Sequence, residues 1–350
     1  MFEIGSEFWT EPNEKGNGIE SCIPTNMGVV YTLCGRTALN MIITDILSYE
    51  KPKTVYMPSY CCHTMIEPFL RNGLEIEFYN VIVSKDGIKS ILTENNCDLV
   101  FLINYFGFID SEIESFARKE REKGKIIIYD ATHSLLCSNN EYSTYDYIYG
   151  SFRKWTGLNA GFAANHGVWT EDPVLKYNNT YSKLRNDSFD LKAEYIRNPE
   201  KVEKQTFLKS FQLAEELLET DYLNYAPDER SRKLMYSLDI DRMRKIRRKN
   251  AEVLINGLKT CQSVILPYDT IKEEECPLFV PVIIRNDRNA LRKYLIDNSI
   301  YLPIHWPISL LHHLNRDTRL IYDEEMSCVC DQRYSESDMD HIVKAIRQFE

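Results

Sequence analysis

The order of hydrophobic and polar positions predicts helices and strands that alternate along the first half of the chain. Apolar residues recur at helical spacing between 36 and 50, and the apolar run at 54–58 is typical of a short buried strand. The alternation continues with a helix that ends at Gly73, strands at 74–81, 98–106 and 125–130, and a helix at 110–124. Strands that alternate with helices indicate a mostly parallel sheet with helices on both faces.

The pattern changes after Trp169, where long polar stretches with helical spacing begin. These predict helices at 204–220 and 240–258, followed by an apolar strand at 278–285 and helices at 288–298 and 335–349. We therefore expect an α/β protein with two domains. Residues 1–230 form a large domain with an N-terminal extension, and residues 231–350 form a smaller C-terminal α+β domain.

Charge and cysteine content narrow the classes of function. The net charge of -10 and the isoelectric point near 5.4 argue against a nucleic-acid partner. The one basic cluster, at 242–250, has helical spacing, so we interpret it as the solvated face of a helix. The N-terminal stretch has no apolar run long enough for a signal peptide or a membrane span, and a cytoplasmic protein is expected.

The ten cysteines do not form a recognisable metal or disulfide pattern. There is no CxxC pair, and the spacing is too irregular for a disulfide framework. The groups Cys61-Cys62-His63 and Cys328-Val329-Cys330 contain zinc-ligating residue types, but adjacent cysteines suit tetrahedral coordination badly. We expect no metal site, and reduced thiols in a reducing compartment.

Three places where an apolar strand ends carry candidate chemistry, because ligands of parallel sheets bind beyond the carboxyl ends of the strands. The first is Gly35-Arg36-Thr37, where a helix begins and its free N–H groups suit a phosphate. An ordinary helix cap without a ligand also explains this sequence.

The second place is Asp130, at the end of a buried strand, with His133 three residues later. A carboxylate there needs a cationic or hydrogen-bonding partner, and it either caps a helix or holds a heteroaromatic N–H⁺. The third is Lys154, three residues after Ser151, whose amine can attack a carbonyl as a Schiff-base lysine. A solvent-exposed lysine is the alternative. A ligand with a phosphate, a ring nitrogen and an aldehyde would satisfy all three places, and pyridoxal 5'-phosphate (PLP) has these groups.

The same residues resemble a known family, the DegT-type (sugar aminotransferase) branch of the fold type I PLP-dependent aminotransferases. The resemblance covers nearly the whole chain, through "GRTAL", "VYMPSYCCHTMIEPFLRNG", "INYFG", "IIIYDATHS", "GSFRKW" and "CDQRYSESDMDHIVKAI". No single motif is diagnostic, but their order and their positions on the expected strands make the match specific.

The resemblance implies roles for individual residues. Lys154 would form the Schiff base with PLP, and Asp130 would pair with the pyridine nitrogen. His133 would lie near the ring hydroxyl or the phosphate. The phosphate would be bound by Gly35, Arg36, Thr37 and Ser151. A side chain of the "PSYCCH" loop would stack on the ring, with Tyr60, Cys62 and His63 all open for this role. Asn159 would reach the cofactor of the partner subunit in a homodimer, and His305 would border the substrate.

Three departures from the family pattern weaken the implication of a nucleotide-sugar substrate but leave PLP binding intact. Arg36 replaces a small polar residue, "LNAGF" lacks the paired glycines common after the lysine, and Ser151 lies closer to Lys154 than in the better-known sugar aminotransferases. The resemblance implies an aminotransferase that moves an amino group from an amino acid, expected to be L-glutamate, to a keto acceptor. A nucleotide-linked keto sugar of polysaccharide or natural-product biosynthesis is the expected acceptor class. The alternatives are PLP-dependent elimination or dehydration, and a non-catalytic relative used for binding or regulation. The presence of Lys154 favours transfer over dehydration but leaves elimination open, and Lys154 together with Asp130 disfavours a non-catalytic relative.

Overall fold

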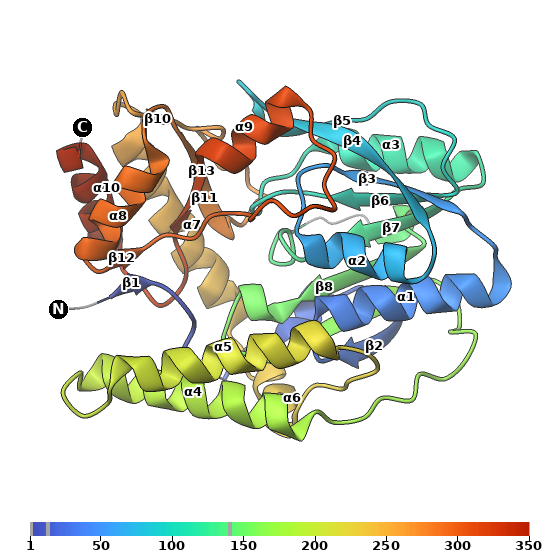
Figure 1. The fold of residues 1–350 in the computed structure, drawn as a ribbon, viewed down its shortest axis with the longest axis horizontal. Coiled ribbons are helices and arrows are strands. Elements are labelled where there is room, and N and C mark those ends of the chain that lie inside the picture. The colour runs from blue at the N-terminus through green and yellow to red at the C-terminus, as the bar shows by residue number, and fades with distance from the viewer. Residues whose placement is uncertain (1–2, 12–14, 139–141, 350) are drawn as a thin grey trace.

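A large central sheet organises the first half of the molecule (Figure 1). The computed structural model describes residues 3–11, 15–138 and 142–349. Within them, eight strands form one sheet in the order β2-β9-β8-β7-β6-β3-β4-β5. The strands are β2 (Gly28–Thr32), β3 (Thr54–Pro58), β4 (Glu75–Ser84), β5 (Gly87–Ile91), β6 (Leu99–Ile103), β7 (Ile126–Asp130), β8 (Tyr147–Ser151) and β9 (Gly161–Asn165).

Strand direction brings three strand ends to one edge of this sheet. Strands β4, β3, β6, β7 and β8 are parallel, whereas β5 pairs antiparallel with β4. Strand β9 lies antiparallel between β8 and β2. Because β2 is antiparallel to β9, it runs in the same direction as β8. The carboxyl ends of β2, β7 and β8 therefore share one edge.

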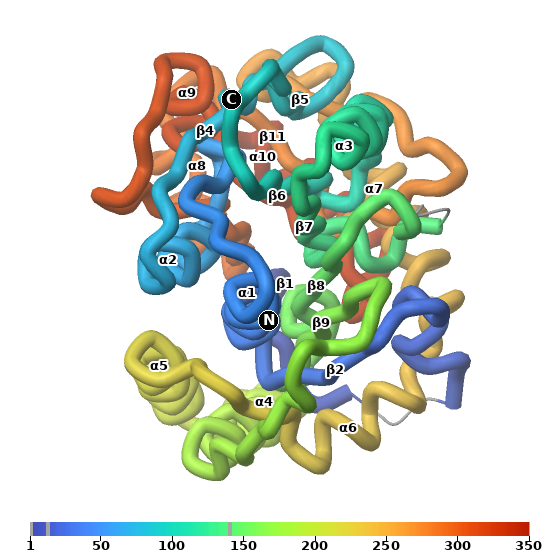
Figure 2. Tube along the Cα trace, turned by 90° about the vertical axis from the view of Figure 1, so that its right-hand side faces the viewer, coloured from blue at the N-terminus to red at the C-terminus, as the bar shows by residue number. Residues whose placement is uncertain are grey.

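Helices cover both faces of the sheet, as expected for a parallel arrangement (Figure 2). Helices α1 (Gly35–Tyr49) and α2 (His63–Arg71) lie on one side, and α3 (Ser111–Glu122) lies on the other. Every residue of the central strand β6 is buried, and this strand consists only of apolar residues. The first short 3-10 helix, η1 (Ile19–Cys22), comes before β2, and two others, η2 (Tyr142–Thr144) and η3 (Phe152–Lys154), flank β8.

A helical hairpin, α4 (Asn179–Arg197) with α5 (Lys204–Thr220), packs next to α1, and the short α6 (Glu229–Met235) follows (Figure 1). Leu33 and Cys34, just before α1, form a small core with Tyr181 of α4 and Leu218 of α5. The hairpin therefore lies over the start of α1, at the edge where the three strand ends meet.

The last part of the chain builds a second core. A three-stranded antiparallel sheet has the order β10-β11-β13, with β10 (Val264–Ile265), β11 (Phe279–Ile284) and β13 (Glu325–Val329). Helices α7 (Ile240–Leu258), α8 (Arg288–Asp297) and α10 (Glu336–Phe349) pack in this core, whereas α9 (Arg316–Glu324) packs in the large core through Ile321 and Tyr322. Strand β1 (Ile4–Gly5) pairs with β12 (Ile300–Tyr301), and Ile4 is buried in this core. The expected division between residues 230 and 231 stays a prediction.

Helix α7 contributes to both cores. Ile240 and Met243 at its start pack in the large core, and Ala251 and Leu254 further along pack in the second. The apolar face of α7 thus packs in the large core at its start and in the second core further along.

The fold class predicted from the pattern of strands and helices is confirmed, with one local correction. Arg247, inside the basic cluster expected to be solvated, is fully buried, because three acceptors satisfy its guanidinium. No helix in the described part of the chain is both long and apolar enough to cross a membrane.

Candidate functional site

The three predicted strand ends line one cavity of about 250 Å³. It opens at the carboxyl ends of β2, β7 and β8 and is bounded on its outer side by α5. The predicted site residues in its wall are Gly35, Arg36, Cys62, His63, Asp130, His133, Ser151 and Lys154. These eight residues come from parts of the chain that are far apart in the sequence, and the order of the strands in the sheet brings them together.

The first turn of α1 presents backbone N–H groups that no side chain caps. The N-cap residue, Cys34, makes no side-chain cap hydrogen bond, and the turn contains no acidic residue. A Cβ atom at Gly35 would lie 3.3 Å from Ser151 Cβ, so only the absence of a side chain keeps the space between them open. This corner is a cradle for an anion at a helix N-terminus.

The other two residues of the predicted phosphate loop face different partners. Arg36 donates to Glu219 of α5 at 2.7 Å and lies over the Tyr222 ring. The Thr37 hydroxyl donates to the Tyr222 carbonyl oxygen at 2.5 Å, and Thr37 does not line the cavity. In the described structure the corner is therefore formed by the Gly35 backbone, Ser151 and the Arg36 charge.

Asp130 is the buried carboxyl of the cavity. It is 1% exposed; its Oδ1 accepts from the Thr132 N–H at 2.8 Å, and its Oδ2 accepts from the Tyr149 hydroxyl at 2.7 Å. Burial raises the pKa of this carboxyl, and the two hydrogen-bond donors and the charge of Lys154 oppose that shift. A cation placed against Asp130 would replace the solvation that it has lost.

His133 is a neutral imidazole in the cavity wall. Burial, together with the charge of Lys154, lowers the pKa of His133 to about 3. The Phe106 N–H donates to Nδ1 at 3.2 Å, so we assign the ring proton to Nε2. The ring stacks on Trp306, with centroids 5.4 Å apart. His133 is therefore fixed in orientation and able to donate from Nε2.

Lys154 lies in η3, directly after β8, and its side chain is exposed to the cavity. The neighbouring Arg153 pairs with Glu215 of α5 at 3.0 Å and donates to the Tyr181 hydroxyl at 2.7 Å. Among the described residues, Lys154 has neither an ion pair nor a hydrogen bond of its amine. It is the unpaired primary amine of this wall.

The "PSYCCH" loop contributes two of its three candidate side chains. Cys62 and His63 line the cavity, with Cys62 Sγ 3.8 Å from His63 Nδ1. Tyr60 is fully buried behind them, and its hydroxyl donates to the His305 carbonyl oxygen. Of the three residues left open for stacking on the ring, only Cys62 and His63 therefore face the cavity.

Two further predicted residues lie outside the cavity. Asn159 is buried against α6, where its N–H donates to Ser231 and its amide to Asp228 and Asn186. His305 is also buried; its Nδ1 lies 2.9 Å from Ser327 Oγ, and the next residue, Trp306, takes the place in the wall. Their predicted contacts with a partner subunit's cofactor and with substrate stay predictions.

Sequence reasoning missed several wall residues. Glu215 and Glu219 of α5 face the cavity, as do Tyr149 and Trp306. The signal for the two acids is their spacing of four, which places them on one helix face, but an exposed helix has the same pattern. Nothing in the sequence distinguishes Tyr149 as a site residue, because it lies within a buried strand, β8, whose pattern does not mark single positions.

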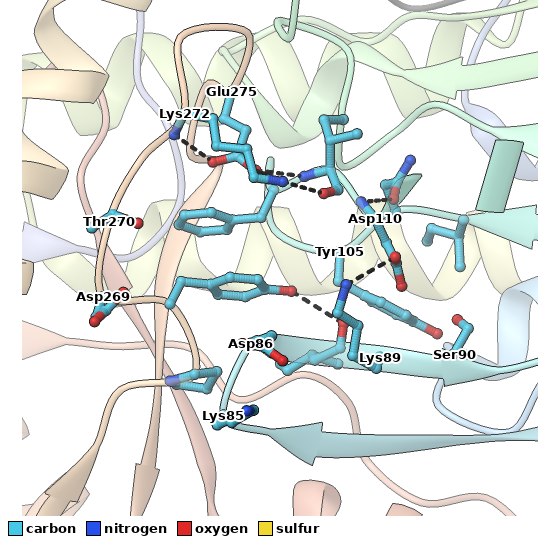
Figure 3. A pocket seen from close by; sticks show the side chains of 17 residues that line it. Lys85, Asp86, Lys89, Ser90, Tyr105, Asp110, Asp269, Thr270, Lys272 and Glu275 are labelled. Atoms are coloured by element: carbon cyan, nitrogen blue, oxygen red, sulfur yellow. Dashed lines mark hydrogen bonds and ion pairs between the residues drawn. The ribbon is translucent and has the colours of Figure 1, made fainter. Parts of the chain in front are cut away.

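A second cavity, of about 270 Å³, lies between the β4–β5 hairpin, the loop after β6 and residues 267–275 (Figure 3). Its main charged groups pair with one another, Lys89 with Asp110 at 2.9 Å and Lys272 with Glu275 at 3.7 Å. It does not combine an uncapped helix start, a buried carboxyl and an unpaired amine. We therefore place the candidate active site in the first cavity.

Comparisons with known proteins agree on the fold. No model of a protein family matches the sequence, and no curated protein matches it either. Among solved structures, the aminotransferase TlmJ from Streptoalloteichus hindustanus is 15% identical, with a TM-score of 0.66 over 97% of this chain and 92% of that chain. The chain has the fold of this aminotransferase.

Two other solved structures extend this result. The sugar aminotransferase CalS13 from Micromonospora echinospora is 13% identical, with a TM-score of 0.62 over 99% of this chain and 100% of that one. Spr1654 from Streptococcus pneumoniae in its PLP form is 14% identical, with a TM-score of 0.63 over 98% and 92%. The aminotransferase fold therefore spans the chain almost completely.

Proposed function

We propose that this protein is a PLP-dependent aminotransferase. One observation carries the proposal: an uncapped helix start with Gly35 and Ser151, the buried carboxyl of Asp130 and the unpaired amine of Lys154 line the same cavity. The fold shared with aminotransferases supports it.

The residues present fit PLP at each of its polar groups. The helix start and the space between Gly35 and Ser151 suit the phosphate. Asp130, whose buried carboxyl lacks a cationic contact within hydrogen-bond distance, suits a protonated pyridine nitrogen. Lys154 suits the aldehyde, with which a primary amine condenses. His133, donating from Nε2, suits the ring hydroxyl oxygen.

When bound, PLP supplies an electron sink that stabilises negative charge at the α-carbon of an amino acid. The residues of the protein would hold the cofactor and orient its ring. Asp130 would keep the ring nitrogen protonated, and its hydrogen bonds from Thr132 and Tyr149 fix the carboxylate orientation. The Lys154 Nζ is the atom in the wall that would take the proton from the donor's α-carbon and return it.

The substrates follow from the resemblance and from the neighbours. L-glutamate is the proposed amino donor, and a keto sugar carried on a nucleotide is the proposed acceptor class, supported by a solved neighbour that is a sugar aminotransferase. We also propose a cytoplasmic homodimer with shared sites, in which Asn159 and His305 would act as the resemblance implies.

The experiment that tests this function uses absorption and covalent trapping together. Purified protein is incubated with PLP, its visible spectrum is recorded, and the spectrum is recorded again after addition of L-glutamate. Borohydride reduction of a separate sample, taken before glutamate is added, followed by peptide mass spectrometry, locates the cofactor. We expect a visible band, its loss with glutamate, and PLP attached to Lys154.

The matched variants are Lys154→Ala and Lys183→Ala. Lys183 lies on the exposed face of α4 and pairs with Asp187, away from the cavity. Lys154→Ala should remove the band and the trapped adduct, whereas Lys183→Ala should keep both. PLP trapped on another lysine would refute the assignment. A band that no amino donor changes would refute transfer and favour other PLP chemistry.

A further inference from the structure

Cys62 differs from the other cysteines of the chain in its exposure. All ten cysteines lie in the described residues and are free thiols, and nine of them are buried. Cys62 is partly exposed, and it lines the candidate active-site cavity. Cys34 also lines this cavity, but it is buried, so Cys62 is the more accessible of the two thiols to a small molecule that enters.

The thiol of Cys62 contacts the imidazole of His63, which in turn contacts the carboxylate of Glu219. Cys62 Sγ lies 3.8 Å from His63 Nδ1, and His63 Nε2 lies 3.4 Å from Glu219 Oε2. The other carboxylate oxygen of Glu219 accepts from Arg36 at 2.7 Å. A base held by a third group next to a nucleophile is the arrangement that activates thiols.

The electrostatics agree with this geometry. Burial by itself raises the pKa of Cys62, but hydrogen bonds from His63 and Thr64 outweigh it and lower the pKa to about 7. The hydrogen bond with Cys62 and the proximity of Glu219 raise the pKa of His63. Both shifts favour transfer of the Cys62 proton to the His63 imidazole.

The remaining titratable groups around Cys62 do not compete for this proton. Tyr149 of β8 and Tyr322 of α9 have pKa values raised by burial, so they stay neutral. The adjacent Cys61 is fully buried, and burial raises the pKa of its thiol well above the ordinary value. Cys61 is thus neither a competing nucleophile nor an exposed target.

We propose that Cys62, with His63 and Glu219, forms a reactive-thiol site in the cavity wall that takes small anionic disulfides. The Cys62 thiolate attacks one sulfur of the disulfide, a new S–S bond forms to Cys62, and the other half leaves as a thiolate that takes a proton from solvent. The disulfide is the oxidant. The unpaired charge of Lys154 in the same wall favours an anionic reagent such as glutathione disulfide.

Such an adduct has a steric consequence. A glutathionyl group on Cys62 would stand in the cavity that the proposed function assigns to PLP, so the modified protein should bind PLP more weakly. This consequence rests on the proposed function, whereas the reactivity of Cys62 does not.

The test measures the adduct directly. The protein as purified is treated with glutathione disulfide, and intact mass and peptide mapping give the number and position of the adducts. We expect one adduct per chain, on Cys62, that dithiothreitol reverses. Cys61→Ser should leave it unchanged and Cys62→Ser should abolish it. An adduct on another cysteine, or none on the folded protein, would overturn the proposal.

A second measurement isolates the role of the two partners. The rate of iodoacetamide alkylation of Cys62 is followed against pH, with an expected midpoint near 7, below the value of about 8.5 for an ordinary thiol. His63→Gln and Glu219→Gln should each move the midpoint upward. Unchanged midpoints in both variants would refute the relay. Lys154→Ala should still be modified, which separates this site from failure of the proposed function.

Discussion

Arg247 of α7 donates a hydrogen bond from Nη2 to the carbonyl oxygen of Trp155, 3.0 Å away, and Trp155 directly follows Lys154. The same guanidinium donates to the Leu278 carbonyl and to the Gln332 side chain, and it lies over the Trp155 ring. The Trp155 indole in turn donates to the Thr132 carbonyl oxygen at 2.7 Å. A fully buried arginine thus joins helix α7 to the turn that carries the proposed catalytic amine.

Arg247→Met should loosen this turn. The change removes three hydrogen bonds of a buried charge, and we expect a loss of roughly 2–4 kcal/mol in the free energy of unfolding. We also expect at least an order of magnitude weaker PLP binding, since Lys154 loses its fixed position. Urea unfolding and absorbance titration with PLP measure the two effects.

Arg248→Met is the matched control for this prediction. Arg248 is the next residue, but its guanidinium donates to carbonyl oxygens of the 272–275 loop. It should leave PLP binding within about twofold. Equal losses of PLP affinity in both variants would show that Arg247 acts only through general stability.

Asp130→Asn should separate activity from stability. Its amide oxygen can still accept from the Thr132 N–H and its NH₂ can donate to the Tyr149 oxygen, so only the Tyr149 hydroxyl proton loses its acceptor and stability should fall by only about 1 kcal/mol. The pKa of Asp130 is raised by burial, so a neutral side chain is tolerated there. Without the carboxylate, the ring nitrogen loses its counter-charge, and transfer should fall by about 100-fold or more. Turnover with L-glutamate and thermal unfolding are compared, with Tyr149→Phe expected to lose less activity.

Gly35→Val should act on phosphate binding alone. The new side chain would fill the space toward Ser151, where even a Cβ lies only 3.3 Å from Ser151 Cβ. PLP affinity should drop at least about tenfold, equal to about 1.4 kcal/mol, while pyridoxal, which lacks the phosphate, should bind as before. Gly167→Val is the control, because a Cβ at Gly167 meets nothing within 4 Å. A parallel loss for pyridoxal would contradict the phosphate assignment.

Glu325 predicts a pH dependence of stability. It is fully buried behind His305, and burial raises its pKa from 4.5 to about 8. The folded chain therefore holds a proton that the unfolded chain releases above pH 4.5. The free energy of unfolding should fall as the pH rises from 4.5 to 8, by about 1.4 kcal/mol for each pH unit.

Glu325→Gln should abolish this decline, as urea unfolding at several pH values would show. Glu120→Gln is the comparison, because Glu120 is buried beside Lys123 and Lys125, which together lower its pKa in spite of burial. Its stabilisation is present above its unfolded pKa and is lost only in acid, so the slope between pH 5 and 8 should persist. A slope that survives in Glu325→Gln would contradict the assignment.

Much of the fold follows from local pattern. The helices expected at 204–220 and 240–258 have these bounds in the structure, because each has a continuous apolar stripe. The place of β9 between β2 and β8 was not predictable, since "GFAAN" has no alternation and strand order is set by pairing partners far away in sequence.

The candidate site also has features that the sequence predicts and features that it does not. Gly35, Asp130 and Lys154 were predictable because each lies at or shortly after the end of a predicted strand. The direction of the Thr37 hydroxyl was not, because it depends on the Tyr222 carbonyl after α5, which is 185 residues away. Nor was the burial of Arg247, since a charged residue within a basic stretch has the same local pattern whether solvent or carbonyl oxygens surround it.

Helix α7 has its first turns in the large core and its later turns in the second core. Most of the stability of a helix comes from the packing of its apolar face. If either core unfolded, the turns of α7 that pack in it would lose this support, and apolar residues of α7 would become exposed. We therefore expect the large core and the second core to melt in a single cooperative transition, and heat capacity measurements should give one peak instead of two.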